Sequence, residues 1–344
     1  MKAVRYYGPE DIRIEEVPAP EVEPGGILVE VECCAICGTD FKAYYLGNPR
    51  IKPPQTLGHE FVGKVFRVTP EVMSFQVGDR VTMATSISCG QCNFCRLGQT
   101  NRCSQLTPIS YDYPGAFADY IAVPARGVAG GFVVKVPEGL DEEACLAEPI
   151  SCAVNSQIIA GVKPGDTVVV IGAGPMGAIH TQVARANGAE KIIVTQRSKT
   201  RLTLAENFGA DAVIDVTTTE SVDEVKRLTN GLGADVAIVT APEAIAQEQA
   251  FYMVKKGGMV NLFASLPKGV SDLQIDSRLI HYNEIFLSGA SDSTAKHVEI
   301  ALQFLSKRLI NPGAIITHRL PLTDFHQGIQ LLKERKALKI LLKP

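Results

Sequence analysis

The chain has 344 residues, which is too long for one ordinary hydrophobic core and predicts two domains. Its hydrophobic content of 46% and charged content of 21% are typical of a globular protein and exclude a disordered one. The 34 basic and 37 acidic side chains give a net charge of −3, so neither nucleic acid nor an anionic membrane is an expected partner.

The beginning of the chain and its cysteine content together favour a cytoplasmic protein. The opening residues MKAVRYYGPEDIRIEE contain no apolar segment typical of a secretory signal. No stretch reaches the length of about 18 apolar residues that a membrane span requires. Nine cysteines, an odd number, without a secretory signal indicate a reducing compartment.

Residues 1–155 are predicted to form a β-rich domain. Short apolar runs such as FVGKVFRV and ADYIAVPA are interrupted by turn signals rich in glycine and proline, at 24–26, 52–54 and 113–115. A Greek-key or barrel-like arrangement is therefore expected.

Residues 156–290 are predicted to form a doubly wound parallel sheet, because strands and helices alternate there. Residues 291–344 hold two more helices, 297–306 and 322–333, and a final strand; too short to fold alone, they are expected to complete the first domain. The predicted strands of the sheet are Thr167–Ile171, Lys191–Thr195, Ala212–Asp215, Val236–Thr240, Gly258–Phe263 and Ile285–Leu287, with helices such as Pro175–Asn187 and Arg201–Phe208 between them.

Four cysteines within a short segment predict a structural zinc site. Cys89, Cys92, Cys95 and Cys103 follow the spacing C-x2-C-x2-C-x7-C. Zinc binds four thiolates tetrahedrally at about 2.3 Å, and a site closed by four protein ligands has no open position for chemistry. Two disulfide bonds are the alternative, which an intracellular chain disfavours.

A glycine-rich turn predicts a dinucleotide site. Gly172, Gly174 and Gly177, with Pro175 and Met176 between the last two, form the motif G-x-G-x-x-G after an apolar strand and before a helix. The glycines permit a tight turn, a close approach of backbone to pyrophosphate and close packing of helix on strand, and the helix N-terminus offers N–H groups to phosphate. A tight turn without a ligand is the alternative, which the βα units that follow disfavour.

The end of the second strand of the parallel sheet favours NADP over NAD. An NAD site carries an acid about 20 residues after the glycines, which binds the ribose 2′-OH. Here Gln196 takes that place and is followed by Arg197, Ser198 and Arg201. These side chains could bind a 2′-phosphate, and a solvent-exposed basic turn is the alternative.

Cysteine, histidine and acidic residues suggest a second zinc site in the first domain. They occur in the segments 37–40, 58–60 and 147–149. Three protein ligands and a water are typical of a catalytic zinc. Each residue also has an ordinary structural interpretation, as a buried thiol or a hydrogen-bonded imidazole, so spacing alone leaves this site open.

Taken in order, the motifs resemble those of the zinc-dependent medium-chain dehydrogenases/reductases, and the polyol (sorbitol-like) branch most. The resemblance covers essentially the whole chain through CGTD, GHE, the four-cysteine segment, EPISCA, GAGPMG and ITHRLPL. It implies an α/β fold with a GroES-like catalytic domain and a Rossmann domain. It also implies NAD(P)-dependent interconversion of a secondary alcohol, a polyol or a related small molecule, and its ketone, two zinc ions per chain, and a homo-oligomer, tetramer or dimer.

The resemblance assigns metal ligands by position. Cys37, His59 and Glu148 match the ligands of the catalytic zinc. Glu60 matches an acid that binds the metal directly or through water. A zinc ion held in this way lowers the pKa of a substrate hydroxyl, and the nicotinamide takes the hydride.

The resemblance also assigns a path for the substrate proton. Thr39 matches the hydroxyl residue that takes this proton, and Asp40 matches an acid that orients the ligand histidine. Lys42 stands where many members have a histidine at the outer end of the relay, so the relay is expected to run through water.

The substrate pocket departs from the sorbitol branch. Ala43 and the stretch 289–293 replace an aromatic residue and an arginine–aromatic pair. Another polyol, an inositol-like ring or an amino-substituted alcohol is therefore considered, with Asp292 either as an amine partner or as an ordinary helix N-terminal residue. A threonine-type dehydrogenase is the alternative function. The net charge disfavours a zinc-ribbon binding protein, and the complete ligand set disfavours a non-catalytic nucleotide sensor.

Overall fold

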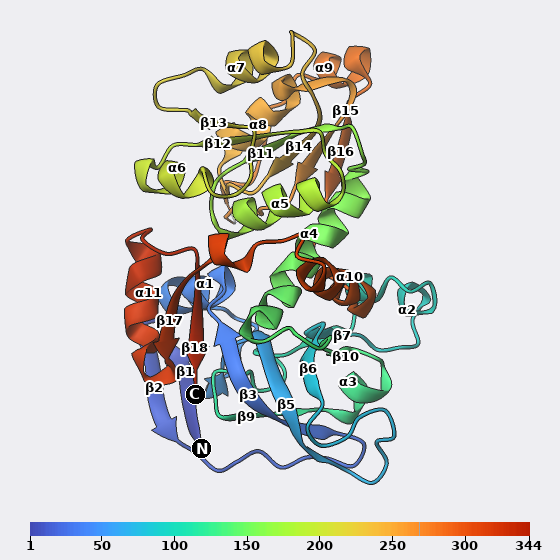
Figure 1. Cartoon of the computed structure of the whole chain (residues 1–344), viewed down its shortest axis with the longest axis vertical. Coiled ribbons are helices and arrows are strands. Elements are labelled where there is room, and N and C mark those ends of the chain that lie inside the picture. Colours follow the sequence, from blue (N-terminus) through green and yellow to red (C-terminus); the bar gives the residue numbers. More distant parts are fainter. Residues whose placement is uncertain (268) are drawn as a thin grey trace. The chain divides into compact units, whose positions relative to one another are not determined.

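A computed structural model describes residues 1–267 and 269–344, and its contacts divide the chain into two compact units. The first unit contains both ends of the chain, and the segment Arg308–Ile315 groups with the second (Figure 1). The first unit comprises Met1–Ser151, Asp292–Lys307 and Ile316–Pro344, and the second comprises Cys152–Ser291 and Arg308–Ile315.

The second unit is built on a parallel sheet with the strand order β13-β12-β11-β14-β15-β16. This arrangement confirms the predicted doubly wound sheet. Its central strands are buried on both faces and therefore read as continuous apolar runs. The strands are β11 (Thr167–Ile171), β12 (Lys191–Gln196), β13 (Ala212–Asp215), β14 (Ala234–Val239), β15 (Val254–Leu262) and β16 (Phe286–Gly289).

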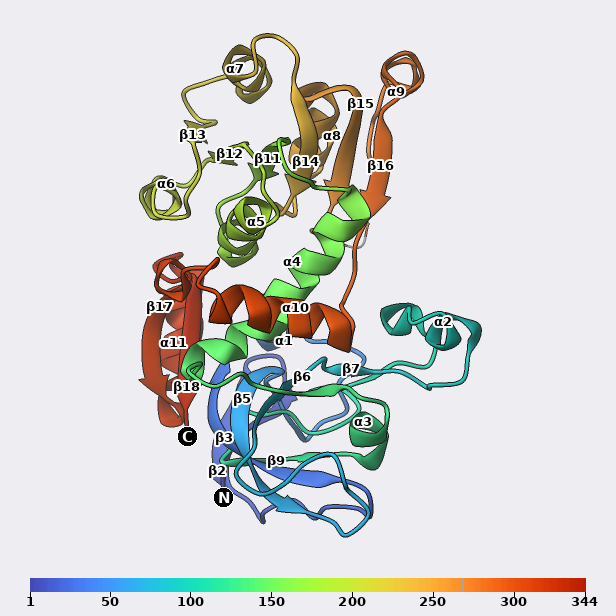
Figure 2. The same cartoon turned by 45° about the vertical axis from the view of Figure 1, so that its right-hand side comes forward.

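Helices lie on both sides of this sheet, with α5 on one side and α8 on the other (Figures 1 and 2). Buried side chains of α7 and α8, among them Val225 and Phe251, pack with the strands into one hydrophobic core. The helices are α5 (Pro175–Ala186), α6 (Lys199–Ala205), α7 (Ser221–Leu228), α8 (Ala244–Met253) and α9 (Ser277–Asn283), and α4 (Ala147–Ala160) precedes β11.

The first unit is rich in β-structure, as predicted. One sheet has the order β2-β1-β4, a second has the order β10-β6-β5-β3-β18-β17 with β9 also paired to β3, and β7 pairs with β8. The strands are β1 (Lys2–Gly8), β2 (Asp11–Glu16), β3 (Ile27–Ala35), β4 (Gln55–Thr56), β5 (Glu60–Val68), β6 (Arg80–Met83), β7 (Ser86–Ile87), β8 (Thr107–Pro108), β9 (Tyr120–Val123), β10 (Val133–Lys135), β17 (Ile316–Pro321) and β18 (Lys339–Lys343).

Helices of the first unit connect these strands, and the α2 segment projects beyond β7 (Figure 2). The helices are α1 (Gly38–Leu46), α2 (Asn93–Arg96), α3 (Ala125–Ala129), α10 (Ala295–Ser306) and α11 (Phe325–Lys333), and short 3₁₀ turns span Thr100–Arg102, Glu142–Leu146, Pro312–Ala314 and Leu322–Asp324.

The last strand, β18, lies beside β3 from the N-terminal part of the chain, with Leu341 opposite Ala35 (Figure 1). This pairing brings residues of the C-terminal segment into the neighbourhood of Cys37 and His59. Within the part of the chain that the structure describes, no helix has both the length and the apolar character that a bilayer crossing requires.

Candidate functional site

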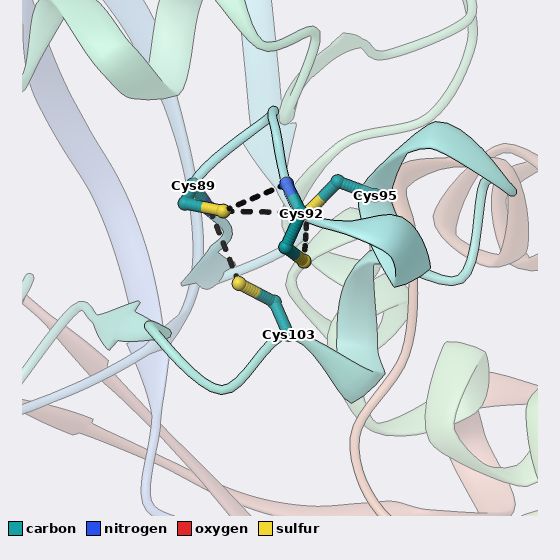
Figure 3. A group of neighbouring side chains, drawn as sticks. All are labelled: Cys89, Cys92, Cys95 and Cys103. Carbon is teal, nitrogen blue, oxygen red and sulfur yellow. Dashed lines mark hydrogen bonds between the residues drawn. The ribbon is translucent and has the colours of Figure 1, made fainter.

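The four cysteines predicted to hold zinc converge in one lobe of the first unit (Figure 3). The four side chains are free thiols. The sulfur atoms of Cys89 and Cys95 lie 3.9 Å apart, and those of Cys92 and Cys95 lie 3.4 Å apart. Four ligands at the usual Zn–S distance would be separated by about 3.8 Å, so the cluster fits a tetrahedral zinc ion.

Backbone N–H groups point at these sulfur atoms. The N–H of Cys92 donates to Sγ of Cys89 at 3.3 Å, and the N–H of Gln105 donates to Sγ of Cys103 at 3.3 Å. Hydrogen bonds from Gln91 and Cys92 lower the pKa of Cys89 to about 6. At Cys89 the loop therefore favours the thiolate, which is the form that binds metal.

A second group of possible metal ligands brings Cys37, His59 and Glu60 together in the first unit. One ligand atom from each lies within 4.8 Å of the others. Cys37 is the N-cap of α1, Glu60 is the first residue of β5, and His59 directly precedes that strand. Glu148, in the first turn of α4, does not belong to this group under the same 4.8 Å limit. Its charge nevertheless acts on His59.

The His59 ring lies between Thr39 and Asp40. Its Nε2 is 3.3 Å from the Thr39 hydroxyl, and its Nδ1 is 3.9 Å from a carboxylate oxygen of Asp40. Nδ1 is buried and has no hydrogen-bond partner among the described residues. Asp40 also accepts a hydrogen bond from the N–H of Cys37 at 2.9 Å, so one carboxylate caps α1 and faces the imidazole.

Negative charge is concentrated around His59. Burial opposes a charged imidazole, but Cys37, Asp40 and Glu148 outweigh it and raise the pKa of His59 well above its usual value. Burial, with the charges of Glu60 and Asp292, raises the pKa of Glu148 to about 7. A thiol, an imidazole and several crowded carboxyl groups form a donor set that fits a zinc ion.

Two further residues contact this group and were not identified from the sequence. The Tyr111 hydroxyl is hydrogen-bonded to the Thr39 side chain, and Lys339 forms a buried ion pair with Glu60. Asp292, considered above as an amine partner, receives hydrogen bonds from the Ser86 hydroxyl and the backbone of Ser293.

Lys42, predicted at the outer end of the proton relay, lies exposed on α1. It stands three residues after Thr39, so the two side chains share a face of the helix. The role of Lys42 stays a prediction.

The glycine-rich turn has the geometry expected of a nucleotide site. Gly172 follows β11 with a φ of +106°, and Gly174 is the N-cap of α5. A Cβ atom at Gly177 would lie 1.9 Å from the carbonyl oxygen of Gly172, so only glycine fits there. The Thr240 hydroxyl donates to the carbonyl oxygens of Ile171 and Gly172, both at 3.0 Å, and holds the turn.

The two arginines after β12 have different surroundings. The Gln196 side chain accepts hydrogen bonds from the N–H groups of Arg197 and Ser198, at 2.7 and 3.0 Å. The Arg197 guanidinium pairs with Glu243. A Cβ atom at Gly174 would lie 3.4 Å from Nη1 of Arg201, so Arg201 is the arginine beside the glycine turn. A turn open to backbone N–H groups and lined by this cation fits a phosphate-bearing nucleotide.

Both units match known protein families. Residues 23–138 match the alcohol dehydrogenase GroES-like domain, and residues 175–307 match the zinc-binding dehydrogenase family.

Curated relatives match over nearly the full length of the chain. The L-threonine 3-dehydrogenase of Pyrococcus abyssi (strain GE5 / Orsay) is 36% identical over 351 aligned positions, which cover 99% of this chain and 97% of that protein. The sorbitol dehydrogenase of Bacillus subtilis (strain 168) is 30% identical and covers 100% of this chain and 97% of that protein.

A solved structure with a bound nucleotide also resembles this chain. It is a protein from Sinorhizobium meliloti 1021, proposed to be a zinc-binding dehydrogenase and bound to NADP. The two chains share 32% sequence identity with a TM-score of 0.91, over 100% of this chain and 99% of that one.

Proposed function

Since this chain belongs to the zinc-dependent medium-chain dehydrogenase/reductase family, it is an enzyme that interconverts an alcohol and its carbonyl compound with NAD(P), and we propose that the substrate is a polyol or a related hydroxylated small molecule. The family and the fold class predicted from the sequence are thereby confirmed. The observation that supports this site most directly is the clustering of Cys37, His59 and Glu60 beside the Thr39 hydroxyl.

We assign the catalytic zinc to Cys37, His59 and Glu148, with Glu60 beside them. Zinc bound there would act as a Lewis acid on the substrate oxygen. Asp40 faces the other nitrogen of His59 and would fix the orientation of the ring, which is a usual arrangement at zinc sites. Thr39, hydrogen-bonded to Tyr111, would accept the substrate proton.

The nucleotide would be held by the glycine turn of the second unit. NAD(P) supplies the hydride chemistry when it is bound. The N-terminus of α5 would present its N–H groups to the pyrophosphate, and Gly174 leaves room for that approach. Gln196 carries no charge that would repel a 2′-phosphate.

A threonine-type dehydrogenase is a second candidate because of Asp292. Its carboxylate acts electrostatically on His59 and Glu148, so it lies near the assigned zinc ligands. A carboxylate there could pair with the ammonium group of an amino alcohol or a hydroxy amino acid. It could equally accept hydrogen bonds from the neighbouring hydroxyls of a polyol.

A substrate screen separates these candidates. Initial rates would be measured with NADP and with NAD against polyols, simple secondary alcohols and L-threonine. We expect polyols to give the highest kcat/KM. Turnover of L-threonine alone, with a large loss in Asp292→Asn, would favour the second candidate. Absence of NAD(P) reduction with every class would contradict both.

We also propose that the protein is a homo-oligomer, a dimer or a tetramer. The parallel sheet ends at β16, and Phe286 and Leu287 on this edge strand are exposed. An apolar edge strand is a template for pairing with another copy of the same strand. A monomeric mass in solution would contradict this proposal.

The four-cysteine cluster is proposed to be structural. We expect Cys92→Ser to lower the melting temperature by several degrees and to reduce zinc content from two ions per chain to one, because a structural zinc contributes folding energy. Calorimetry and metal analysis check both. A variant that melts like the wild type would show that the cluster holds no metal.

NADPH is expected to bind more tightly than NADH, and Arg201 to carry most of the preference. Arg201→Ala should cost NADPH about 1.5–3 kcal/mol, the range for a hydrogen bond to a charged group, and cost NADH little. Gln196→Asp should shift the preference toward NAD, because a carboxylate repels the 2′-phosphate. Fluorescence titration of both nucleotides measures these effects.

Arg197→Ala is the matched control for Arg201→Ala. It removes the same group from an arginine that is paired with Glu243, so its effect on NADPH should be smaller. Equal affinities of the wild type for NADPH and NADH would mean that the basic turn does not contact the nucleotide.

A further inference from the structure

Arg197 and Glu243 form an ion pair between two loops of the second unit. Nη2 of Arg197 lies 2.5 Å from a carboxylate oxygen of Glu243. The Arg197 side chain is 53% exposed, and the Glu243 side chain is 35% exposed. Because water and salt reach both groups, the pair is weak, and a ligand that competes for either group can open it.

The two loops stand on opposite sides of the glycine turn. β11, which leads into that turn, lies between β12 and β14 in the sheet (Figure 1). Arg197 directly follows β12, and Glu243 comes four positions after the end of β14. Neighbouring strands lie about 4.8 Å apart, so the ends of β12 and β14 are about 10 Å apart. Ligands of such sheets bind in the crevice at this edge, and the ion pair therefore crosses the assigned nucleotide crevice.

Contacts of the glycine turn support this placement. The N–H of Ala241 donates to the carbonyl oxygen of Ile171 at 3.1 Å, so the segment that leads to Glu243 is bound against the turn. Arg201, from the segment after β12, lies beside Gly174. The segments that carry the two charges thus both border the place where the pyrophosphate would bind.

The sequence around the pair gives each side chain few other tasks. The Gln196 side chain fixes the backbone of Arg197 by accepting a hydrogen bond from its N–H at 2.7 Å, and the guanidinium extends beyond it. Glu243 is the N-cap of α8, but its side chain makes no capping hydrogen bond. Short polar residues are the usual N-caps because their side chains bind the first turn of the helix. The Glu243 carboxylate serves the ion pair instead.

We propose that the Arg197–Glu243 ion pair is a latch across the nucleotide crevice, which either nucleotide must open and which favours NADP over NAD. Opening the pair removes a favourable contact of the free enzyme. The 2′-phosphate of NADP replaces this contact by binding the released guanidinium, whereas NAD has no such group and leaves the arginine unpaired. This inference rests on the proposed nucleotide site at the glycine turn.

Arg197→Ala tests the proposal because the two nucleotides should respond in opposite directions. NADH should bind about 2–5-fold more tightly, the range for an exposed ion pair that no longer has to be opened. NADPH should bind about 3–10-fold more weakly, because its phosphate loses a charged partner. Fluorescence titration of both nucleotides at one ionic strength measures the two changes.

Glu243→Gln removes the other half of the pair and should strengthen the binding of both nucleotides. NADH should again gain about 2–5-fold. NADPH should gain at least as much, because Arg197 is retained and a carboxylate that repels the 2′-phosphate is neutralised. Arg197→Ala combined with Glu243→Gln should bind NADH no more tightly than either single variant, because the same ion pair can be lost only once.

Two controls complete the experiment. 2′,5′-ADP and 5′-AMP differ by the same phosphate but carry no nicotinamide, so calorimetry with them should show the same signs without any turnover. Glu224→Gln breaks an exposed ion pair with Arg227 on α7 and changes the net charge equally, and it should leave both affinities unchanged. If Arg197→Ala lowers the melting temperature, Arg197→Gln replaces it and should show the same signs.

Weaker or unchanged NADH binding in Arg197→Ala, or gains of the two single variants that add in the double variant, would overturn the proposal. Tighter NADPH binding in Arg197→Ala would also overturn it, because the arginine would then not contact the 2′-phosphate. Failure of the underlying nucleotide site is recognised separately. In that case Gly174→Val, which fills the approach to the glycine turn, would leave both affinities unchanged, whatever the Arg197 and Glu243 variants do.

Discussion

Replacing Cys37 with serine is expected to abolish measurable turnover and leave NADPH binding nearly intact. Serine is a poor zinc ligand at neutral pH because its hydroxyl does not ionise, so the assigned catalytic zinc would be lost. The glycine turn belongs to the other compact unit and does not depend on this metal. Steady-state rates, zinc content and a fluorescence titration with NADPH measure the three properties.

The same chemical change at Cys92 is the matched control. Cys92→Ser should lower thermal stability, and the protein that remains folded should retain most of its activity. We therefore expect Cys37→Ser to lose activity, and Cys92→Ser to lose thermal stability while it keeps most of its activity. Near wild-type rates in Cys37→Ser would remove this cysteine from the reaction, and equal losses of activity in both variants would contradict the division into catalytic and structural sites.

Most of the parallel sheet could be predicted from the sequence. Thr167–Ile171 and Ala212–Asp215 have the predicted ends, because fully buried parallel strands are short apolar runs between turn signals. The prediction was less accurate for β15, which begins at Val254 rather than Gly258. Its pairing with β14 is irregular near Ala234. The first residues of β15 include two lysines and two glycines, so the sequence there does not look like a buried strand.

Helix α8 was not singled out from the sequence, and its apolar residues follow no clear stripe. α8 carries Phe251 and Met253 in the core but also exposes Ile245 and Tyr252. A helix that is apolar on several sides shows no 3.6-residue periodicity. Tertiary packing, rather than a local pattern, therefore determines where this segment is buried.

Some residues of the candidate site could be identified from the sequence, and others could be identified only from the structure. Cys37, Thr39 and Asp40 are close in the chain, and His59 and Glu60 are adjacent, so local motifs were enough to single them out. Lys339 and Tyr111 carry no local signal. Their positions depend on the pairing of β18 with β3 and on the path of the loop after β8, which are long-range features of the fold.

Thr39→Val is expected to reduce kcat by about 10²–10⁴-fold, the usual contribution of a general acid–base group. Valine has nearly the same shape as threonine and lacks the hydroxyl, so packing around α1 should change little. The hydroxyl lies 3.3 Å from Nε2 of His59 and is hydrogen-bonded to Tyr111. Its removal would leave the substrate proton without an acceptor.

Zinc content and NADPH affinity should be unchanged in Thr39→Val, which separates this effect from loss of metal. Thr39→Ser keeps a hydroxyl and should retain much of the activity, whereas Tyr111→Phe should show an intermediate loss if the proton passes on through Tyr111. Exchange of solvent water for D₂O should slow the wild type more than Thr39→Val, because the variant has lost the relay. A Thr39→Val enzyme with wild-type kcat would show that the proton leaves by another path, and Lys42 with its exposed ammonium group would then be the next residue to replace.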